Sequence, residues 1–228
     1  MADKNTKKLW KSARDGNLAE VARLLGLGGV NINWVNEDAQ GETPLIVATR
    51  NDRLEVVRTL LDAGADVNHR NEGDTTAIYW AAFKGNEDMI NLLLERGADA
   101  NIAGRDGSTP LNIAKLKGNT PAVFLLLDAL GDYNQTDAEG KTLLHWASSR
   151  GKIPLINFLL EKGVDVNQKD KKGKTAISLA KNEDVRKLLQ ESGKLSGDAA
   201  EGLKRRKHKK TYKRKIMKKG RKTNKNRK

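Results

Sequence analysis

Residues 42–68 begin with Glu42-Thr43-Pro44-Leu45-Ile46-Val47-Ala48 and end with Gly64-Ala65-Asp66-Val67-Asn68. Parts of this stretch return downstream with a constant step of 33 residues. The residues that keep the step are Thr43, Thr76, Thr109, Thr142 and Thr175; Ala48, Ala81, Ala114, Ala147 and Ala180; Leu60, Leu93, Leu126 and Leu159; and Asn68, Asn101, Asn134 and Asn167. A period of this length that carries Thr-Pro-Leu-x-x-Ala indicates a stacked array in which every repeat supplies one turn and two helices.

The pattern resembles that of the ankyrin-repeat family, most fully at Gly41 to Ala48 and at Leu60 to Asn68. The resemblance extends over roughly residues 7–190. It implies an all-α repeat solenoid in which each repeat is a β-turn finger followed by two antiparallel helices. It also implies a protein that acts by binding other proteins, although it does not identify a partner.

Six repeats are expected, and the first and last of them act as caps. Their predicted bounds are 7–36 for the N-terminal cap, 38–70, 71–103, 104–136, 137–169, and 170–190 for the C-terminal cap. Charged residues interrupt the apolar pattern of the first repeat, as expected of a terminal repeat with one face in water. The last repeat lacks four residues between Ala180 and Leu188, and we interpret this shortening as a feature of the C-terminal cap. The first finger is about two residues longer than the others and contains Trp34, which we expect to be exposed.

Local chemistry explains where the predicted helices begin and end. Thr43 is expected to cap the first helix of its repeat, and Pro44 suits the first helical turn. In the fourth repeat Leu130 replaces the glycine that ends the second helix and Gly131 follows it, so we expect that end to differ by one residue. The asparagines of the Asp-x-Asn segments are expected to bond the backbone of their own turns.

Two more residue types are interpreted as structural. His145 occupies the position at which the family pattern has a histidine, and the resemblance implies that it holds neighbouring fingers together. Trp80 and Trp146 occupy equivalent positions one residue before the alanine of the first helix, and we expect both in the core.

The composition argues against catalysis and against several kinds of site. The chain has no cysteine, and its three histidines are far apart, so disulfides, thiolate chemistry and a histidine metal site are not expected. No glycine-rich phosphate loop or nucleophile motif interrupts the repeats. We therefore expect a non-enzymatic protein without a cofactor or metal. No apolar run is long enough to span a membrane, and the start of the chain does not resemble a signal peptide, so an intracellular location is expected.

The resemblance places a protein partner on the concave surface, which is formed by finger tips and the ends of the first helices. The predicted protein-binding residues are Trp34, Arg50, Asn51, Arg70, Phe83, Lys84, Arg105, Leu116, Lys117, Lys141, Arg150 and Lys169. The 33-residue step places Phe83 beside Leu116 in one column and Lys84 beside Lys117 in another, and Arg150 extends the second column. Such a surface suits a segment with hydrophobic anchors and acidic residues. The alternative is that the basic residues are ordinary solvated surface and that Phe83 packs against a finger.

The positive charge of the chain is concentrated at its C-terminal end. Residues 204–228 contain 16 of the 43 Lys and Arg residues and no Asp or Glu, whereas the rest of the chain has 27 basic and 29 acidic residues. We interpret residues 191–203 as a linker and residues 204–228 as a disordered polybasic tail, because the tail has too few apolar residues to offset the entropy of ordering. The residues predicted to contact nucleic acid or an import receptor are Lys204, Arg205, Arg206, Lys207, Lys209, Lys210, Lys213, Arg214 and Lys215.

Several roles of the tail remain open at this stage. It is compatible with import into the nucleus or nucleolus, with RNA or DNA contact that is independent of sequence, with adhesion to acidic lipid, and with a purely solubilising role. We interpret the chain as a monomeric interaction scaffold or adaptor that binds a protein client, with nucleus or nucleolus favoured over cytoplasm. The alternative is a ribonucleoprotein-associated component that is anchored to RNA by its basic tail.

Overall fold

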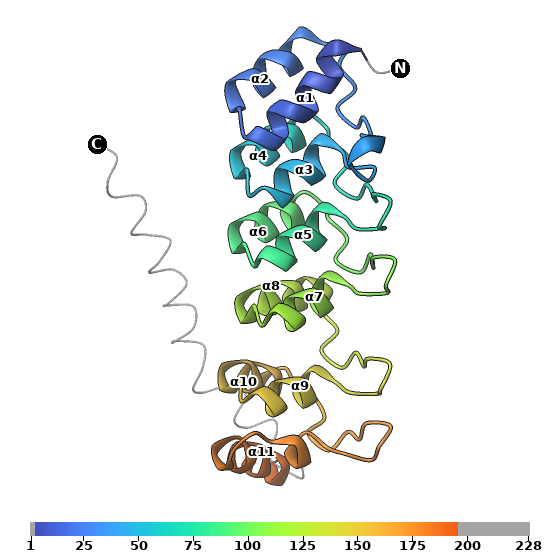
Figure 1. Cartoon of the computed structure of the whole chain (residues 1–228). Coiled ribbons are helices and arrows are strands. Elements are labelled where there is room, and N and C mark those ends of the chain that lie inside the picture. Colours follow the sequence, from blue (N-terminus) through green and yellow to red (C-terminus); the bar gives the residue numbers. More distant parts are fainter. Residues whose placement is uncertain (1–2, 196–228) are drawn as a thin grey trace, which may run out of the picture. The chain divides into compact units, whose positions relative to one another are not determined.

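The structure is a computed structural model that describes residues 3–195. The described residues form two compact units, the first ending at Asp132 and the second beginning at Tyr133. The helices described in the first unit are α1 (Lys4–Asp15), α2 (Leu18–Leu27), the 3₁₀ turn η1 (Glu37–Ala39), α3 (Pro44–Arg50), α4 (Leu54–Asp62), α5 (Ala77–Lys84), α6 (Glu87–Glu95), α7 (Pro110–Lys117) and α8 (Thr120–Leu130) (Figure 1). Those described in the second unit are α9 (Leu143–Arg150), α10 (Ile153–Glu161), the 3₁₀ turn η2 (Ile177–Leu179) and α11 (Glu183–Leu195).

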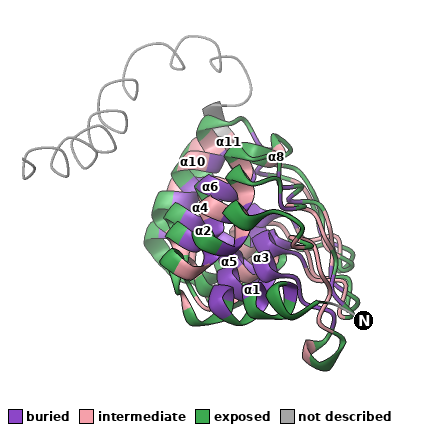
Figure 2. Cartoon of the chain, turned by 90° about the horizontal axis from the view of Figure 1, so that it is seen from above, coloured by how far each residue is buried: buried purple, intermediate pink, exposed green. Residues whose placement is uncertain are grey.

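In the first unit the helices form two layers. The first helices of the repeats pack in the order α1, α3, α5 and α7, and the second helices pack in the order α2, α4, α6 and α8. The buried residues lie where the two layers meet (Figure 2). Leu60 and Leu93 of the second helices are fully buried there, and so are Ala48 and Ala81 of the first helices. The small alanines allow neighbouring repeats to approach closely, so each repeat is stabilised mainly by its neighbours. The predicted helical repeat architecture is confirmed.

The threonine caps form at most of the predicted helix starts. Thr43 Oγ1 accepts a hydrogen bond from the backbone N–H of Ile46 over 3.3 Å, and Thr109 Oγ1 accepts one from the N–H of Asn112 over 3.2 Å. Thr76 differs, because its buried Oγ1 has no hydrogen-bond partner among the described residues. Proline follows Thr43 and Thr109 and restricts the backbone of each of these threonines, whereas Ala77 follows Thr76.

The fingers are joined to one another by backbone hydrogen bonds with a regular spacing. In the first unit the N–H of Glu72 donates to the carbonyl of Gln40 over 3.0 Å, and the N–H of Arg105 donates to that of Gly73 over 2.9 Å. In the second unit the N–H of Lys171 donates to the carbonyl of Glu139 over 2.9 Å. Each of these bonds fixes one finger to the next in the same register.

The asparagines at the ends of the repeats act over a longer range than predicted. Asn33 Oδ1 accepts from the N–H of Asp66, and Asn68 Oδ1 accepts from the N–H of Asp99, both over 2.8 Å. The partner of each asparagine therefore belongs to the following repeat and not to its own turn. Within the turn, it is the aspartate that accepts a backbone hydrogen bond, as Asp66 Oδ1 does from the N–H of Asn68 over 3.0 Å.

The ends of several helices differ from the sequence expectation. Helix α1 begins at Lys4, three residues before the predicted start of the first repeat, because Asp3 accepts hydrogen bonds from the backbone N–H groups of Asn5 and Thr6. Helix α8 runs to Leu130, two residues beyond the register of α4 and α6, and Gly131 ends it with a φ of 69°. That backbone conformation favours glycine.

The last repeat is remodelled by its missing residues. Its first helix is reduced to the 3₁₀ turn η2, and α11 follows at Glu183, which is earlier than the 33-residue step predicts. The second helix of this repeat, α11, has 13 residues and continues to Leu195. The first part of the predicted linker at 191–203 is therefore helical. The remainder of that linker, and the tail at 204–228, lie outside the described residues.

Candidate protein-binding site

A cluster of aromatic and basic side chains lies at the ends of three consecutive first helices in the first unit. We call Arg50, Trp80, Phe83, Leu116 and Lys117 the aromatic–basic cluster; they belong to α3, α5 and α7. The centre of the Arg50 guanidinium lies 5.8 Å from the centroid of the Trp80 ring. The ring centroids of Trp80 and Phe83 are 5.6 Å apart, and Lys117 Nζ lies 3.9 Å from the centroid of Phe83. A continuous series of contacts thus joins the three helices.

Trp80 is the centre of this cluster, and the prediction of a core position for it is wrong. Its side chain is only half-buried, although its Nε1 atom is buried without a hydrogen-bond partner among the described residues. Tyr79 packs edge-on against it with ring centroids 5.9 Å apart, and burial, followed by the charge of Asp106, raises the pKa of Tyr79. A large ring next to the thin, alanine-lined contact between first helices has room only toward the surface.

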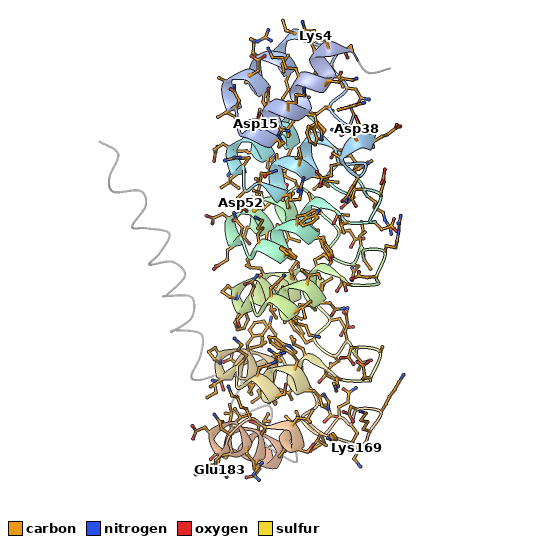
Figure 3. All side chains as sticks on the ribbon, in the orientation of Figure 1. Lys4, Asp15, Asp38, Asp52, Lys169 and Glu183 are labelled. Atoms are coloured by element: carbon orange, nitrogen blue, oxygen red, sulfur yellow. The ribbon has the colours of Figure 1, made fainter. Side chains whose placement is uncertain are left out.

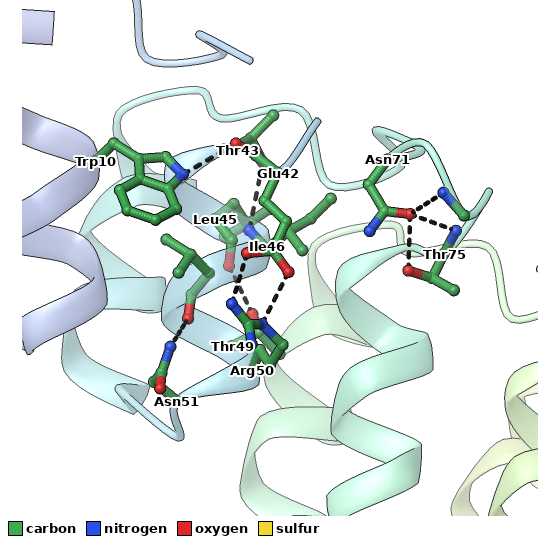
Figure 4. A network of polar contacts seen from close by, with 12 residues as sticks. Trp10, Glu42, Thr43, Leu45, Ile46, Thr49, Arg50, Asn51, Asn71 and Thr75 are labelled. Carbon is green, nitrogen blue, oxygen red and sulfur yellow. Dashed lines mark hydrogen bonds and ion pairs between the residues drawn. The ribbon is translucent and has the colours of Figure 1, made fainter. Parts of the chain in front are cut away.

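Arg50 is held at one end of the cluster by a buried carboxylate. Its Nη2 donates to Glu42 Oε2 over 2.9 Å, and its Nε lies 2.8 Å from Oε1 in an orientation that makes an ion pair but not a hydrogen bond (Figure 4). The Glu42 side chain is only 3% exposed. Burial raises the pKa of Glu42, and the hydrogen bond and charge of Arg50 oppose this rise. Arg50 therefore compensates the buried charge of Glu42, which leaves less of its own charge for a partner.

The other end of the cluster is open to solvent. Leu116 is 72% exposed, which is unusual for a large apolar side chain. Lys117 is exposed, and its ammonium group contacts the face of Phe83 but forms no ion pair with a described residue. The neighbouring Lys84 lies 3.7 Å from Asp52 in an exposed ion pair. This end of the cluster offers apolar area and an unpaired positive charge, so it suits an apolar side chain next to a carboxylate.

Comparison with known protein families identifies the repeats. A family model described as "Ankyrin repeats (3 copies)" matches residues 2–71 and 111–197, which is more than half of the chain, and one described as "Ankyrin repeats (many copies)" matches residues 51–94 and 78–127. The chain belongs to the ankyrin-repeat family. Ankyrin repeats are modules for protein–protein interaction, and the predicted family and fold are confirmed.

Three curated relatives match part of the repeats, and each of the three is a much longer protein. A protein named "Probable E3 ubiquitin-protein ligase XBOS34" from Oryza sativa subsp. japonica is 37% identical over 85 residues, which are 36% of this chain and 16% of that protein. Human Inversin is 48% identical over 50 residues, or 22% of this chain and 5% of Inversin. A chicken protein named "Arf-GAP with coiled-coil, ANK repeat and PH domain-containing protein 2" is 34% identical over 82 residues, or 36% of this chain and 10% of that protein. The chain therefore spans only a small part of the length of each of these relatives.

Three other predicted binding residues in the first unit hold ankyrin fingers and helix ends. Asn51 Nδ2 donates to the carbonyl of Val47 over 2.8 Å and closes the end of α3. Arg70 Nη2 lies 3.3 Å from Asp74 Oδ1 and donates to the next finger at the carbonyl of Ala103. Arg105 donates in the opposite direction, to the carbonyl of Glu72. The two arginines thus link consecutive fingers, a role that the 33-residue pattern does not reveal because the partners are backbone groups of another repeat.

Trp34 lies in a cavity and is half-buried, so the prediction that it is exposed is wrong. The cavity has a volume of about 550 Å³ and is formed between α1 and the first finger. Sequence reasoning identified the long finger and its tryptophan but missed the α1 residues that face it. Their only signal is an i, i+4 pair of lysines on a helix that also carries Trp10.

The second unit contains the remaining predicted residues. Thr142 N–H donates to His145 Nδ1 over 3.0 Å, and His145 Nε2 lies 3.0 Å from the carbonyl of Lys174 in the next finger, so the predicted structural role of His145 is confirmed. Trp146 is half-buried, like Trp80, and not in the core as predicted. Arg150 and Lys169 are exposed, and Lys141 is half-buried. Whether Arg150 extends the column of Lys84 and Lys117 stays a prediction.

Two further kinds of feature, a metal-binding cluster and a membrane-spanning helix, are absent from residues 3–195. No group of three or more His, Cys, Asp or Glu residues within 3–195 is arranged to hold a metal ion. None of the helices in the described part of the chain is long and apolar enough to cross a membrane. The basic residues predicted to contact nucleic acid or an import receptor, from Lys204 to Lys215, lie outside this part of the chain.

Proposed function

We propose that the chain is a non-enzymatic adaptor whose ankyrin repeats bind a protein client at the aromatic–basic cluster. The observation that carries the proposal is the exposed pair Leu116 and Lys117 beside the half-buried Phe83. The client segment has an apolar side chain that packs on Leu116 and Phe83 and a carboxylate that pairs with Lys117. Release of the ammonium group from the ring face to a carboxylate costs little, because an exposed cation–π contact contributes only about 0.5 to 1 kcal/mol.

In this proposal the polybasic segment at 204–228 directs the adaptor to its location in the cell. Its 16 positive charges give strong, salt-dependent attraction to polyanions, and the cluster from Lys204 to Lys210 suits an import receptor. The adaptor acts as a monomer in the nucleus or nucleolus, where RNA and DNA are available to the same charges. The alternative function, an RNA-anchored ribonucleoprotein component, depends on the same segment and makes the ankyrin surface secondary.

The double substitution Phe83→Ala with Lys117→Glu is expected to abolish capture of the protein client in a pull-down while the repeats stay folded. It removes the apolar anchor and reverses the free charge, and each change is on the surface side of the helix layer. The control Lys187→Glu alters an exposed lysine of α11 in the second unit and should leave capture unchanged. If the double variant has an unchanged circular dichroism spectrum and still captures the client normally, the proposed site is ruled out.

A second experiment separates the adaptor from the RNA-anchored alternative. The full chain and a chain that ends at Gly202 are each used for affinity purification, with and without ribonuclease, and the recovered protein and nucleic acid are identified. An adaptor should recover the same protein client in all four preparations. Loss of the client after either ribonuclease or truncation would instead show that basic residues carry the association through RNA.

A further inference from the structure

The cavity between α1 and the first finger is a second candidate binding site in the first unit, and it shares no residue with the aromatic–basic cluster. Helix α1 lines it with Lys7, Trp10 and Lys11, and the finger lines it with Trp34, Glu37 and Asp38. Asp38 is part of η1, the short turn beside α1 and α3 (Figure 3). The cavity volume of about 550 Å³ falls within the range of about 300 to 1,000 Å³ that is typical of ligand pockets.

The two walls of the cavity are fixed to each other. Trp10 Nε1 donates to the carbonyl of Glu42 over 3.0 Å, and the backbone N–H of Asn36 donates to the same carbonyl over 3.1 Å. Trp10 is buried and so anchors α1 against the base of the finger. A single backbone oxygen thereby holds α1 and the finger together, so a ligand need not order this region when it binds.

The charges of the cavity are separated by wall. Lys7 and Lys11, one helical turn apart, lie on the α1 side, whereas Glu37 and Asp38 lie on the finger side. None of these four side chains forms an ion pair with a described residue. Lys8, which is also on α1, differs because its Nζ lies 2.7 Å from Glu20 Oε1 on α2. The indole N–H of Trp34 likewise donates no hydrogen bond within residues 3–195.

We propose that this cavity binds a zwitterionic segment of a partner protein. An acidic side chain of the segment pairs with Lys7 and Lys11, a basic side chain pairs with Glu37 and Asp38, and an apolar side chain between them packs on Trp34. A ligand with one sign of charge satisfies one wall and meets a like charge on the other, so the cavity discriminates against it. The site is independent of the aromatic–basic cluster, and either can fail while the other stands.

The test uses blocked peptides and the four tryptophans of the full chain as reporters. The zwitterionic probes are Gly-Arg-Phe-Glu-Gly and Gly-Glu-Phe-Arg-Gly, and the comparison peptides carry Gln, Arg only or Glu only at both charged positions. Each peptide is titrated into the isotope-labelled protein, and the indole N–H signals are followed by nuclear magnetic resonance. At least one zwitterionic probe should shift the Trp34 signal and bind about tenfold more tightly than the Gln peptide, as two partly exposed ion pairs predict.

Substitutions in the two walls then assign the charges. Glu37→Gln with Asp38→Asn should remove the advantage of the probe's arginine, and Lys7→Gln with Lys11→Gln should remove that of its glutamate. The matched control Lys8→Gln lies on the same helix outside the cavity and should leave binding unchanged. Equal binding of zwitterionic and Gln peptides, or shifts confined to the Trp80 signal, would overturn the proposal.

Discussion

Replacement of Arg50 by methionine is expected to lower the free energy of unfolding by about 3 to 5 kcal/mol at neutral pH. The substitution keeps most of the apolar stem of Arg50 but leaves the Glu42 carboxylate buried, at 3% exposure, without its positive partner. It also removes the contact of the guanidinium with Trp80. Urea unfolding followed by far-ultraviolet circular dichroism measures the change.

The loss should depend on pH. Burial already raises the pKa of Glu42 above its ordinary value of 4.5, and Arg50 is the group that opposes this rise. A carboxyl group with a raised pKa in the folded state binds more protons there than in the unfolded chain, so its ionisation lowers stability as the pH rises through that window. Without Arg50 the pKa of Glu42 rises further, and the variant should therefore lose much more stability at about pH 7 than at about pH 4.

Two controls make this prediction specific. Adding Glu42→Gln to Arg50→Met removes the buried charge and should restore most of the lost stability, whereas a double variant as unstable as the single one would contradict the argument. Arg58→Met breaks an exposed ion pair with Glu55 and should change the free energy of unfolding by no more than about 1 kcal/mol.

Truncation of Leu93 to alanine should cost about 2 to 5 kcal/mol of unfolding free energy. Leu93 is fully buried on α6, in the layer where α6 packs between α4 and α8. The substitution removes packed methyl groups from this buried position and leaves a cavity there. Because each repeat depends on its neighbours, the loss should appear in the unfolding of the unit and not only in α6.

The matched control for Leu93→Ala is Leu116→Ala on α7. Leu116 is 72% exposed, so its truncation should change stability by no more than about 0.5 kcal/mol while it weakens capture of the client. The two variants remove the same atoms from opposite environments. Equal destabilisation by both would show that Leu116 is packed, and would remove the exposed apolar area on which the proposed function depends.

The family and the helical repeat architecture follow from the sequence because their causes are local and repeated. Thr43 caps the helix that Pro44 starts, and both interactions span only a few residues. Leu60 and Leu93 are buried because the same position packs against the same neighbours in each repeat. Even the altered end of α8 is visible in the sequence at Leu130 and Gly131, although its extent is not.

The candidate sites depend on contacts between repeats that differ in sequence, and these only the tertiary structure decides. Arg50 meets Trp80 from the neighbouring repeat, and Lys117 folds over Phe83, which belongs to the repeat before it. The pairing of Arg50 with the buried Glu42 has no periodic signal, because the other repeats lack both residues at these positions. Periodicity reports what the repeats share, whereas a binding surface is made from the side chains in which they differ and from the distances at which stacking places them.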